Sequence, residues 1–164
     1  MADLGDLEKM LLRAAKEIPD KALTIIEVEG KNFIQKNFQD QGFTDSTFDH
    51  WQERQTEDKQ GRDITRYRTN RRGKRGALNK YGSSIKDRAI LTGQATGGNK
   101  LRNSIKSRVL KSVKEVKFYT DKKYAGRHNE GEDGMPKRQF MGKSKYLNTQ
   151  IANKLTKELD KIFK

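Results

Sequence analysis

The sequence contains no cysteine, only two histidines and only two prolines. Because no thiolate is available, a disulfide scaffold, a cysteine zinc site and a catalytic thiol are all excluded. The two histidines, His50 and His128, are too few for a multi-histidine metal site. We therefore expect no bound metal and no cofactor.

Long hydrophobic runs are also missing. The longest nearly apolar run, residues 22–26, is far shorter than the roughly 20 residues that span a bilayer. The first residues include Asp3, Asp6 and Glu8, whereas a signal peptide would begin with positive charge followed by an apolar run. We therefore expect a soluble protein with no membrane partner.

Apolar residues are scarce and charged residues are abundant. Hydrophobic residues make up 32% of the chain and charged residues 35%, against about 45–50% and about 25% in typical globular domains. A chain of 164 residues has the length of one domain. We predict a single domain over residues 1–164 with one modest core and one segment that burial cannot order.

The positive charge is concentrated in one segment. Lys and Arg number 36 and Asp and Glu 22, so the net charge is +14, and residues 62–88 carry ten basic and two acidic residues, or +8. This segment has few large apolar side chains, so burial cannot offset its ordering entropy. We predict a long basic loop over residues 52–88, called the basic loop below. Its candidate contact residues are Arg66, Arg68, Arg71, Arg72, Lys74 and Arg75.

Two interpretations of the basic loop remain open. It either contacts nucleic acid or an acidic protein face, or it is a solvated loop that aids solubility. Crowded like charges repel one another without a counter-surface, which favours a contact. A sequence-nonspecific nucleic-acid-binding protein is therefore the alternative function, although no RNA-binding sheet motif, zinc finger or basic zipper accompanies the charge.

Hydrophobic periodicity predicts helices at both ends of the chain. Residues 1–40 are expected to form two helices that separate at Ile18, because Pro19 disfavours a helical residue before it. Apolar residues at steps of three and four predict a C-terminal helix over residues 144–163, with Ser144 as its N-cap.

Alternation of side chains predicts a hairpin between residues 104–110 and 113–120, with Val116 and Phe118 on its apolar face. Phe43, Phe48 and Trp51 are expected to close the edge of the core from a polar loop. These elements predict an α+β fold. A small, mainly antiparallel sheet would be packed by two N-terminal helices and one C-terminal helix, with the basic loop projecting away.

No group of residues has the spacing of a catalytic site. The sequence has no nucleophile-elbow serine and no Walker loop. Glu130, Glu132 and Asp133 lie in a glycine-rich loop without an apolar pocket to perturb them. His128-Asn129 matches one fragment of a His-Asn-His nuclease, but the second histidine of that class is missing, so we interpret His128 as structural. We predict that the chain is not an enzyme.

Three short blocks follow one another between residues 90 and 142. The first joins Leu91-Thr92-Gly93 to Leu101-Arg102-Asn103-Ser104-Ile105, with Thr96-Gly97 as the alternative match to its Thr-Gly pair. The second is Tyr124-Ala125-x-x-His128-Asn129-x-Gly131, and the third is Pro136-Lys137-Arg138-Gln139-Phe140-Met141-Gly142. In this order, before a C-terminal helix, the blocks resemble the phage virion morphogenesis family. That family includes tail completion and head–tail joining proteins of tailed bacteriophages.

The resemblance implies a structural virion protein at the neck or head-proximal tail end, present in the host cytoplasm during assembly. It implies a homo-oligomeric ring, with neighbouring connector and tail proteins as partners and a contact with packaged DNA. The motif positions to which it assigns structural roles are Gly93, Leu101, Arg102, Ser104, Tyr124, Ala125, His128, Gly131, Pro136, Phe140 and Gly142. Arg138 joins the contact candidates of the basic loop.

The chemistry of these residues predicts a role for several of them. Gly93 and Gly131 suit backbone positions with positive φ, and Tyr124 can bury its ring beside the hairpin. Arg138 and Phe140 alternate, so a short strand would send them to opposite faces. We expect Phe140 to face the core and Arg138 to face a carboxylate or a neighbouring subunit.

Overall fold

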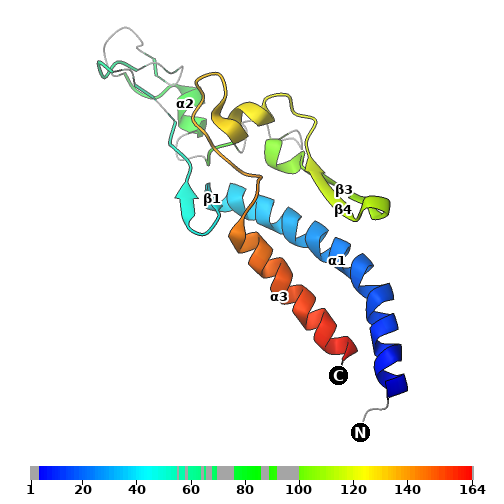
Figure 1. The fold of residues 1–164 in the computed structure, drawn as a ribbon. Helices are drawn as coiled ribbons and strands as arrows, with labels where there is room; N and C mark the ends of the chain where they lie inside the picture. Colours follow the sequence, from blue (N-terminus) through cyan, green and yellow to red (C-terminus); the bar gives the residue numbers. More distant parts are fainter. Residues whose placement is uncertain are drawn as a thin grey trace.

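The computed structural model describes residues 4–54, 56–57, 59–63, 65, 68–69, 76–85, 89–91 and 100–163. Its elements, shown in Figure 1, are α1 (Leu4–Asp40), β1 (Gly42–Thr44), β2 (Phe48–His50), α2 (Lys80–Ile85), β3 (Lys106–Leu110), β4 (Glu115–Tyr119) and α3 (Lys145–Ile162). The predicted α+β class is confirmed. The described residues form two two-stranded antiparallel sheets, β1-β2 and β3-β4, where the sequence predicted a single sheet.

The N-terminal region is one helix, so the predicted break at Pro19 is wrong. Pro19 lies inside α1, which bends in its N-terminal half (Figure 1). A proline removes one backbone hydrogen bond and kinks a helix without having to end it. Here Glu17 forms ion pairs with Arg13 at 2.9 Å and with Lys21 at 3.2 Å, one turn to either side. These pairs link the turns that flank Pro19.

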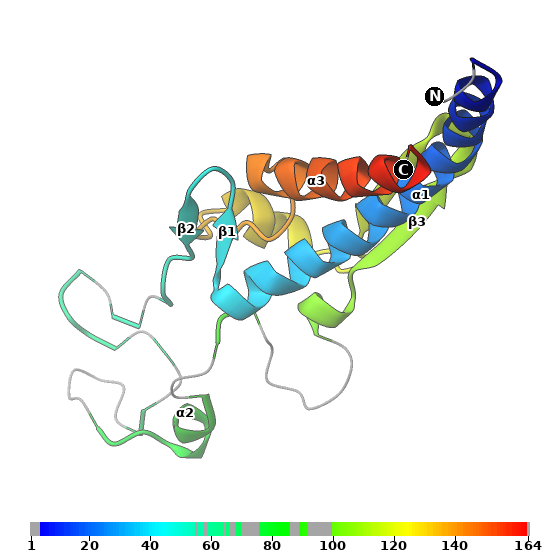
Figure 2. The same ribbon diagram turned by 90° about the horizontal axis from the view of Figure 1, so that it is seen from below.

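The C-terminal helix α3 packs antiparallel along α1, and its prediction is confirmed. Ser144 caps its N-terminus, since the Ser144 side chain accepts a hydrogen bond from the Leu147 N–H at 3.0 Å. The Lys154 ammonium lies 2.6 Å from the Glu29 carboxylate. Closer to the C-terminus of α3, Glu158 lies 3.5 Å from Lys21. The two helices therefore run side by side in opposite directions, as Figure 2 also shows.

The predicted hairpin is confirmed as the β3-β4 pair, whose register places Val109 opposite Val116. Its turn is the 3-10 segment Lys111–Val113 followed by Lys114 at a φ of 52°. Val116 and Phe118 are half-buried, whereas the alternate residues of β4 are exposed. The Phe118 ring packs on Gly30 of α1, where an added Cβ would lie 2.2 Å from the ring. Gly30 therefore sets how closely the hairpin approaches α1.

The β1-β2 hairpin was not predicted. Gln41, at a φ of 57°, ends α1, and its carbonyl accepts a hydrogen bond from the Trp51 N–H at 2.8 Å. The expected role of the aromatic residues is confirmed for Phe43 and Trp51, which are buried, while Phe48 is 39% exposed. The hairpin thus folds the chain back so that Trp51 reaches the core.

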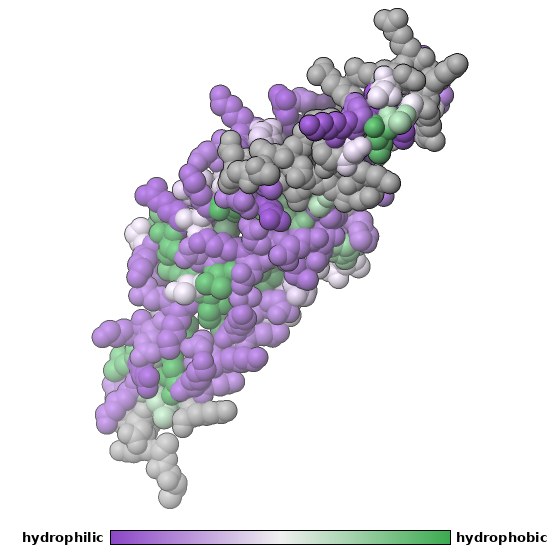
Figure 3. All heavy atoms as spheres, turned by 180° about the vertical axis from the view of Figure 1, so that it is seen from behind, coloured by the Kyte–Doolittle hydropathy of each residue, from purple (hydrophilic) through white to green (hydrophobic). Residues whose placement is uncertain are grey.

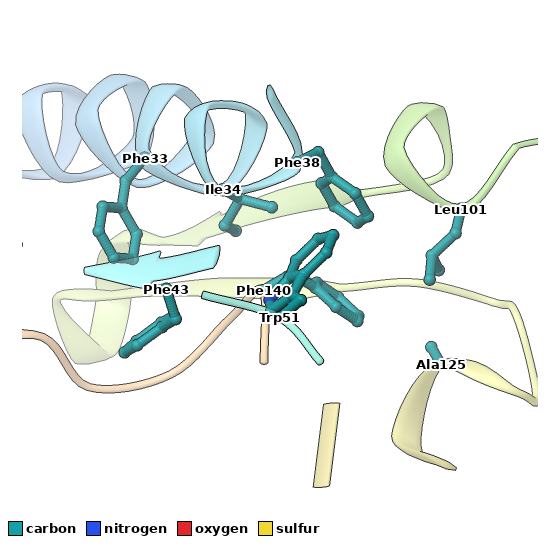
Figure 4. Close-up of a cluster of buried hydrophobic side chains, with 8 residues drawn as sticks. All are labelled: Phe33, Ile34, Phe38, Phe43, Trp51, Leu101, Ala125 and Phe140. Atoms are coloured by element: carbon teal, nitrogen blue, oxygen red, sulfur yellow. The ribbon is translucent and has the colours of Figure 1, made fainter. Parts of the chain in front are cut away.

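The core gathers around Phe38 and Phe140 (Figure 4). The centroid of the Phe38 ring lies 5.0 Å from that of Phe140 and 5.6 Å from that of Trp51. Figure 4 shows these side chains pointing toward one another from α1 and from the chain before α3. The buried cluster comprises Phe33, Ile34, Phe38, Phe43, Trp51, Leu101, Ala125 and Phe140.

The described part of the basic loop lies away from the α1–α3 pair, as Figures 1 and 2 show for α2. Its described residues include two isolated antiparallel bridges, Glu57 with Asp63 and Arg68 with Leu78. Neither these bridges nor α2 was predicted from the sequence. The predicted projecting loop therefore has some local structure in its described residues.

Candidate functional site

The three blocks that carry the family resemblance meet in one buried cluster, called the motif core here. Leu101 from the first block is 2% exposed, Ala125 from the second 6%, and Phe140 from the third 0%. Phe33, Ile34 and Phe38 of α1 belong to the same cluster. The blocks are thus distant in sequence but build a single site.

Asn129 holds the third block in place through its side-chain amide. Its Oδ1 accepts hydrogen bonds from the backbone N–H groups of Phe140 and Met141, both at 3.0 Å. Its Nδ2 donates to the Met141 carbonyl at 3.1 Å. A segment without regular secondary structure thereby has its backbone polar groups satisfied.

Two side chains outside the blocks bind the same segment. Asn37, 1% exposed, donates from Nδ2 to the Phe140 carbonyl at 3.2 Å. The Trp51 indole N–H donates to the Gln139 carbonyl at 2.7 Å. The sequence analysis missed Asn37, but its position four residues after Phe33, on the apolar face of α1, was an available signal. A polar side chain on a buried face almost always has a buried partner.

The first block joins α1 to the end of β4. The Gln35 Nε2 donates to the Arg102 carbonyl at 2.6 Å. The Ser104 hydroxyl donates to the Leu101 carbonyl at 2.8 Å and lies 2.6 Å from the Thr120 hydroxyl oxygen. Arg102 and Ser104 therefore act here through the backbone contacts that shape the 3-10 turn at Leu101–Asn103.

Arg138 is buried, which corrects the expectation that it faces a carboxylate or a neighbouring subunit. Its guanidinium donates to the Gln52 carbonyl at 3.0 Å and to the Glu53 carbonyl at 3.2 Å, and its side chain is nearly inaccessible to solvent. Burial, and then the positive charge of Arg54, lowers the pKa of Arg138. Carbonyl oxygens satisfy a guanidinium as well as a carboxylate would, and sequence spacing could not reveal such partners.

Further contacts fix both ends of the basic loop to the core. On the N-terminal side, the Arg54 guanidinium donates to the Ala89 carbonyl at 2.9 Å, which joins the two ends of the loop. On the C-terminal side, the Gln41 side chain accepts from the Ile90 N–H and donates to the Ile90 carbonyl at 3.3 Å. With Arg138, these contacts form the loop base.

Tyr124 and His128 stack edge to face at the rim of the motif core, with ring centroids 6.0 Å apart. Tyr124 is 41% exposed, so the expectation that its ring is buried is wrong. His128 is half-buried, and its Nδ1 has no hydrogen-bond partner among the described residues. Burial, and then the charge of Arg138, lowers the pKa of His128 below its usual range. The structural interpretation of His128 agrees with this environment.

The remaining motif positions shape the backbone near an open groove. Gly131 has the expected positive φ, 77°, and an added Cβ would lie 3.0 Å from Lys137. Pro136 is half-buried in the extended stretch before Arg138. Gly142 lines the groove, which has a volume of about 570 Å³ and lies between α1, β4 and the start of α3.

Most candidate contact residues of the basic loop lie outside the described residues, namely Arg66, Arg71, Arg72, Lys74 and Arg75, as does Gly93. Arg68 is described. Its guanidinium lies 2.9 Å from the Asp63 carboxylate and donates to the Gly76 carbonyl at 2.9 Å. Hydrogen bonds from Thr65, more than the charge of Arg68, lower the pKa of Asp63. The structure therefore uses Arg68 inside the loop.

The described residues contain no group of three or more His, Cys, Asp or Glu side chains placed to hold a metal ion. In the same part of the chain, no helix is long and apolar enough to cross a membrane. Comparisons with protein-family models, with curated proteins and with solved structures find no match.

Proposed function

We propose that this chain is a structural assembly protein of a tailed-phage particle that completes the tail or joins it to the head. One observation carries the proposal. The three sequence blocks on which the family resemblance rests converge on Phe140 and share one buried cluster. Motifs that are scattered in sequence but build one core are what a shared fold requires.

The polar groups of this site support an assembly role. The side chains of Asn129, Asn37 and Arg138 are engaged with backbone carbonyls or N–H groups. A catalytic group needs instead to face a cavity that admits a substrate. The motif residues therefore serve to position surfaces, and those surfaces are the basic loop, the groove and the exposed parts of the helices.

Assembly would bury these surfaces against other copies and against connector and tail proteins. The loop base anchors residues 52–54 and 89–90, so the basic loop is presented from a fixed position. Its charge suits either an acidic protein ring or packaged DNA.

The test is deletion of the coding sequence from the phage that carries it. We expect filled heads and separate tails to accumulate, and joined particles to return when the intact protein is supplied in trans. A Phe140→Ala chain should fail to restore joining, whereas Asn32→Ala, at an exposed position of α1, should restore it. Normal yields of joined particles without the protein would refute the proposal.

The charge of the basic loop favours a second candidate, sequence-nonspecific binding of nucleic acid. This function predicts an affinity for DNA or RNA that falls steeply as salt rises, because phosphate contacts release counterions. Binding no tighter than that of a scrambled basic peptide would exclude it. Intact joining by a chain with Arg71, Arg72 and Arg75 changed to Glu would exclude an electrostatic docking role for the loop.

A further inference from the structure

The N-terminal part of α1 continues past the end of α3. At 1.5 Å per residue, the 37 residues of α1 span about 55 Å and the 18 residues of α3 about 27 Å. The ion pair between Lys21 and Glu158 lies close to the end of α3. Residues 4–16 of α1, called the helical extension, therefore lie beyond α3, as Figures 1 and 2 both show.

The helical extension carries exposed leucines. Leu7, Leu11 and Leu12 are 48%, 54% and 65% exposed. Leu7 and Leu11 are four residues apart and share one face of the helix, with Leu12 beside them. Figure 3 shows hydrophobic atoms at the surface of the lower end of the molecule, where α1 begins and α3 ends. Large apolar side chains gathered in this way mark a docking surface.

The groove beside the motif core is a matching acceptor. Its apolar lining includes Phe33, Phe118, Met141 and Leu147, and its volume is about 570 Å³. It is open to solvent on a protein that has few apolar residues to spare. Such a groove, rich in aromatic and aliphatic side chains, fits the leucine face of an amphipathic helix.

The extension of the same chain cannot fill this groove. Leu11 and Phe33 are 22 residues apart on one helix, which places them about 33 Å apart at 1.5 Å per residue. A helix cannot fold back over that distance without breaking. The leucines must therefore be covered by another molecule.

Charge indicates that this molecule is a second copy. Residues 1–12 contain Asp3, Asp6 and Glu8 against Lys9, which gives 1 − 3 = −2, so the remainder of the +14 chain carries +16. Lys143 lines the groove and Lys145 follows it, both exposed, while Glu130 is the acidic residue of the lining. An acidic helix end is thus attracted to the basic body of its neighbour.

We propose that the helical extension of one copy docks into the groove of the next copy, head to tail. The donor and acceptor surfaces differ, so each copy can bind two neighbours, and the contact closes into a ring if the rotation allows it. This inference rests on the proposed assembly role and names the self-contact that the role requires.

Disulfide trapping tests the contact directly, because the natural chain has no cysteine. A Leu11→Cys chain and a Lys143→Cys chain, differently tagged, are mixed in a glutathione redox buffer. We expect the mixed disulfide to exceed both like-with-like products. The control is Val28→Cys in place of Leu11→Cys, since Val28 is 48% exposed on α1 but lies outside the extension.

A predominant Leu11→Cys homodimer, or a mixed yield no higher than that of the Val28→Cys control, would overturn the proposal. The double variant Leu11→Cys/Lys143→Cys should form a ladder of species larger than dimers. A product that stops at the dimer would contradict head-to-tail docking.

Sedimentation velocity over a range of concentrations gives an independent readout. Leu11→Ser should weaken self-association roughly tenfold or more, whereas Val28→Ser should change it by no more than about twofold. Self-association unaffected by Leu11→Ser, or a natural chain that stays monomeric throughout, would overturn the proposal. Both experiments use purified protein, so their failure leaves the particle-joining test of the proposed function intact.

Discussion

Replacing Asn129 with alanine should destabilise the protein strongly, because this side chain holds the backbone at Phe140 and Met141. Three hydrogen bonds are lost, two at 3.0 Å and one at 3.1 Å. Phe140 is fully buried, so water cannot replace its partner. At about 1 kcal/mol or more for each backbone group left without a partner, the loss sums to about 3 kcal/mol. In a chain of this size that lowers the Tm by about 6–12 °C.

Urea unfolding followed by circular dichroism measures this loss as a lower midpoint with an unchanged slope. Asn129→Asp keeps the two acceptor bonds and removes the donor, so its loss should be intermediate. Asn32→Ala, at an exposed position in α1, is the matched control and should stay within about 0.5 kcal/mol of the natural chain. An Asn129→Ala chain as stable as this control would refute the role assigned to the Asn129 amide.

Three further predictions concern the packing, the pH dependence and the loop base. Gly30→Ala should destabilise by about 1–3 kcal/mol in urea unfolding, because its Cβ would clash with the aromatic ring of β4. The control Gly126→Ala has room for its Cβ and should not. The lowered pKa of His128 means that the unfolded chain takes up its proton first, so stability should fall as pH drops from about 6.5 toward the folded pKa. His128→Gln should reduce that slope, and an unchanged slope would contradict the assignment. Arg138→Met should speed hydrogen exchange at residues 51–54, because it removes two hydrogen bonds to their carbonyls; unchanged exchange would refute the anchor.

The sequence predicted best those elements whose pattern is local. The C-terminal helix was visible in apolar steps of three and four and in the Ser144 cap, which the structure bears out. The β3-β4 hairpin was visible in the alternation around Val116 and Phe118. In both elements each residue's own preference agrees with the final packing, which is why a local pattern was sufficient.

The elements that were missed depend on contacts between distant residues. Pro19 was expected to divide α1, but tertiary packing and the ion pairs of Glu17 outweigh one missing hydrogen bond. The strands β1 and β2 have three residues each, too short for an alternating pattern to stand out.

The candidate site was predictable in its apolar members and not in its polar ones. Phe140 was expected in the core and is fully buried. The partners of Asn37 and Arg138 are backbone carbonyls 103 and 86 residues away in sequence. Every residue offers a carbonyl, so no residue type marks these partners in the sequence.

The central claim is that this chain is a stoichiometric component of a tailed-phage particle. Quantitative mass spectrometry of gradient-purified particles, with heads and tails separated in parallel, tests it most directly. The account predicts a fixed, low copy number in joined particles and in the fraction that carries the neck or the head-proximal tail end. Absence from particles and tails, with recovery in a nucleic-acid fraction instead, would contradict it.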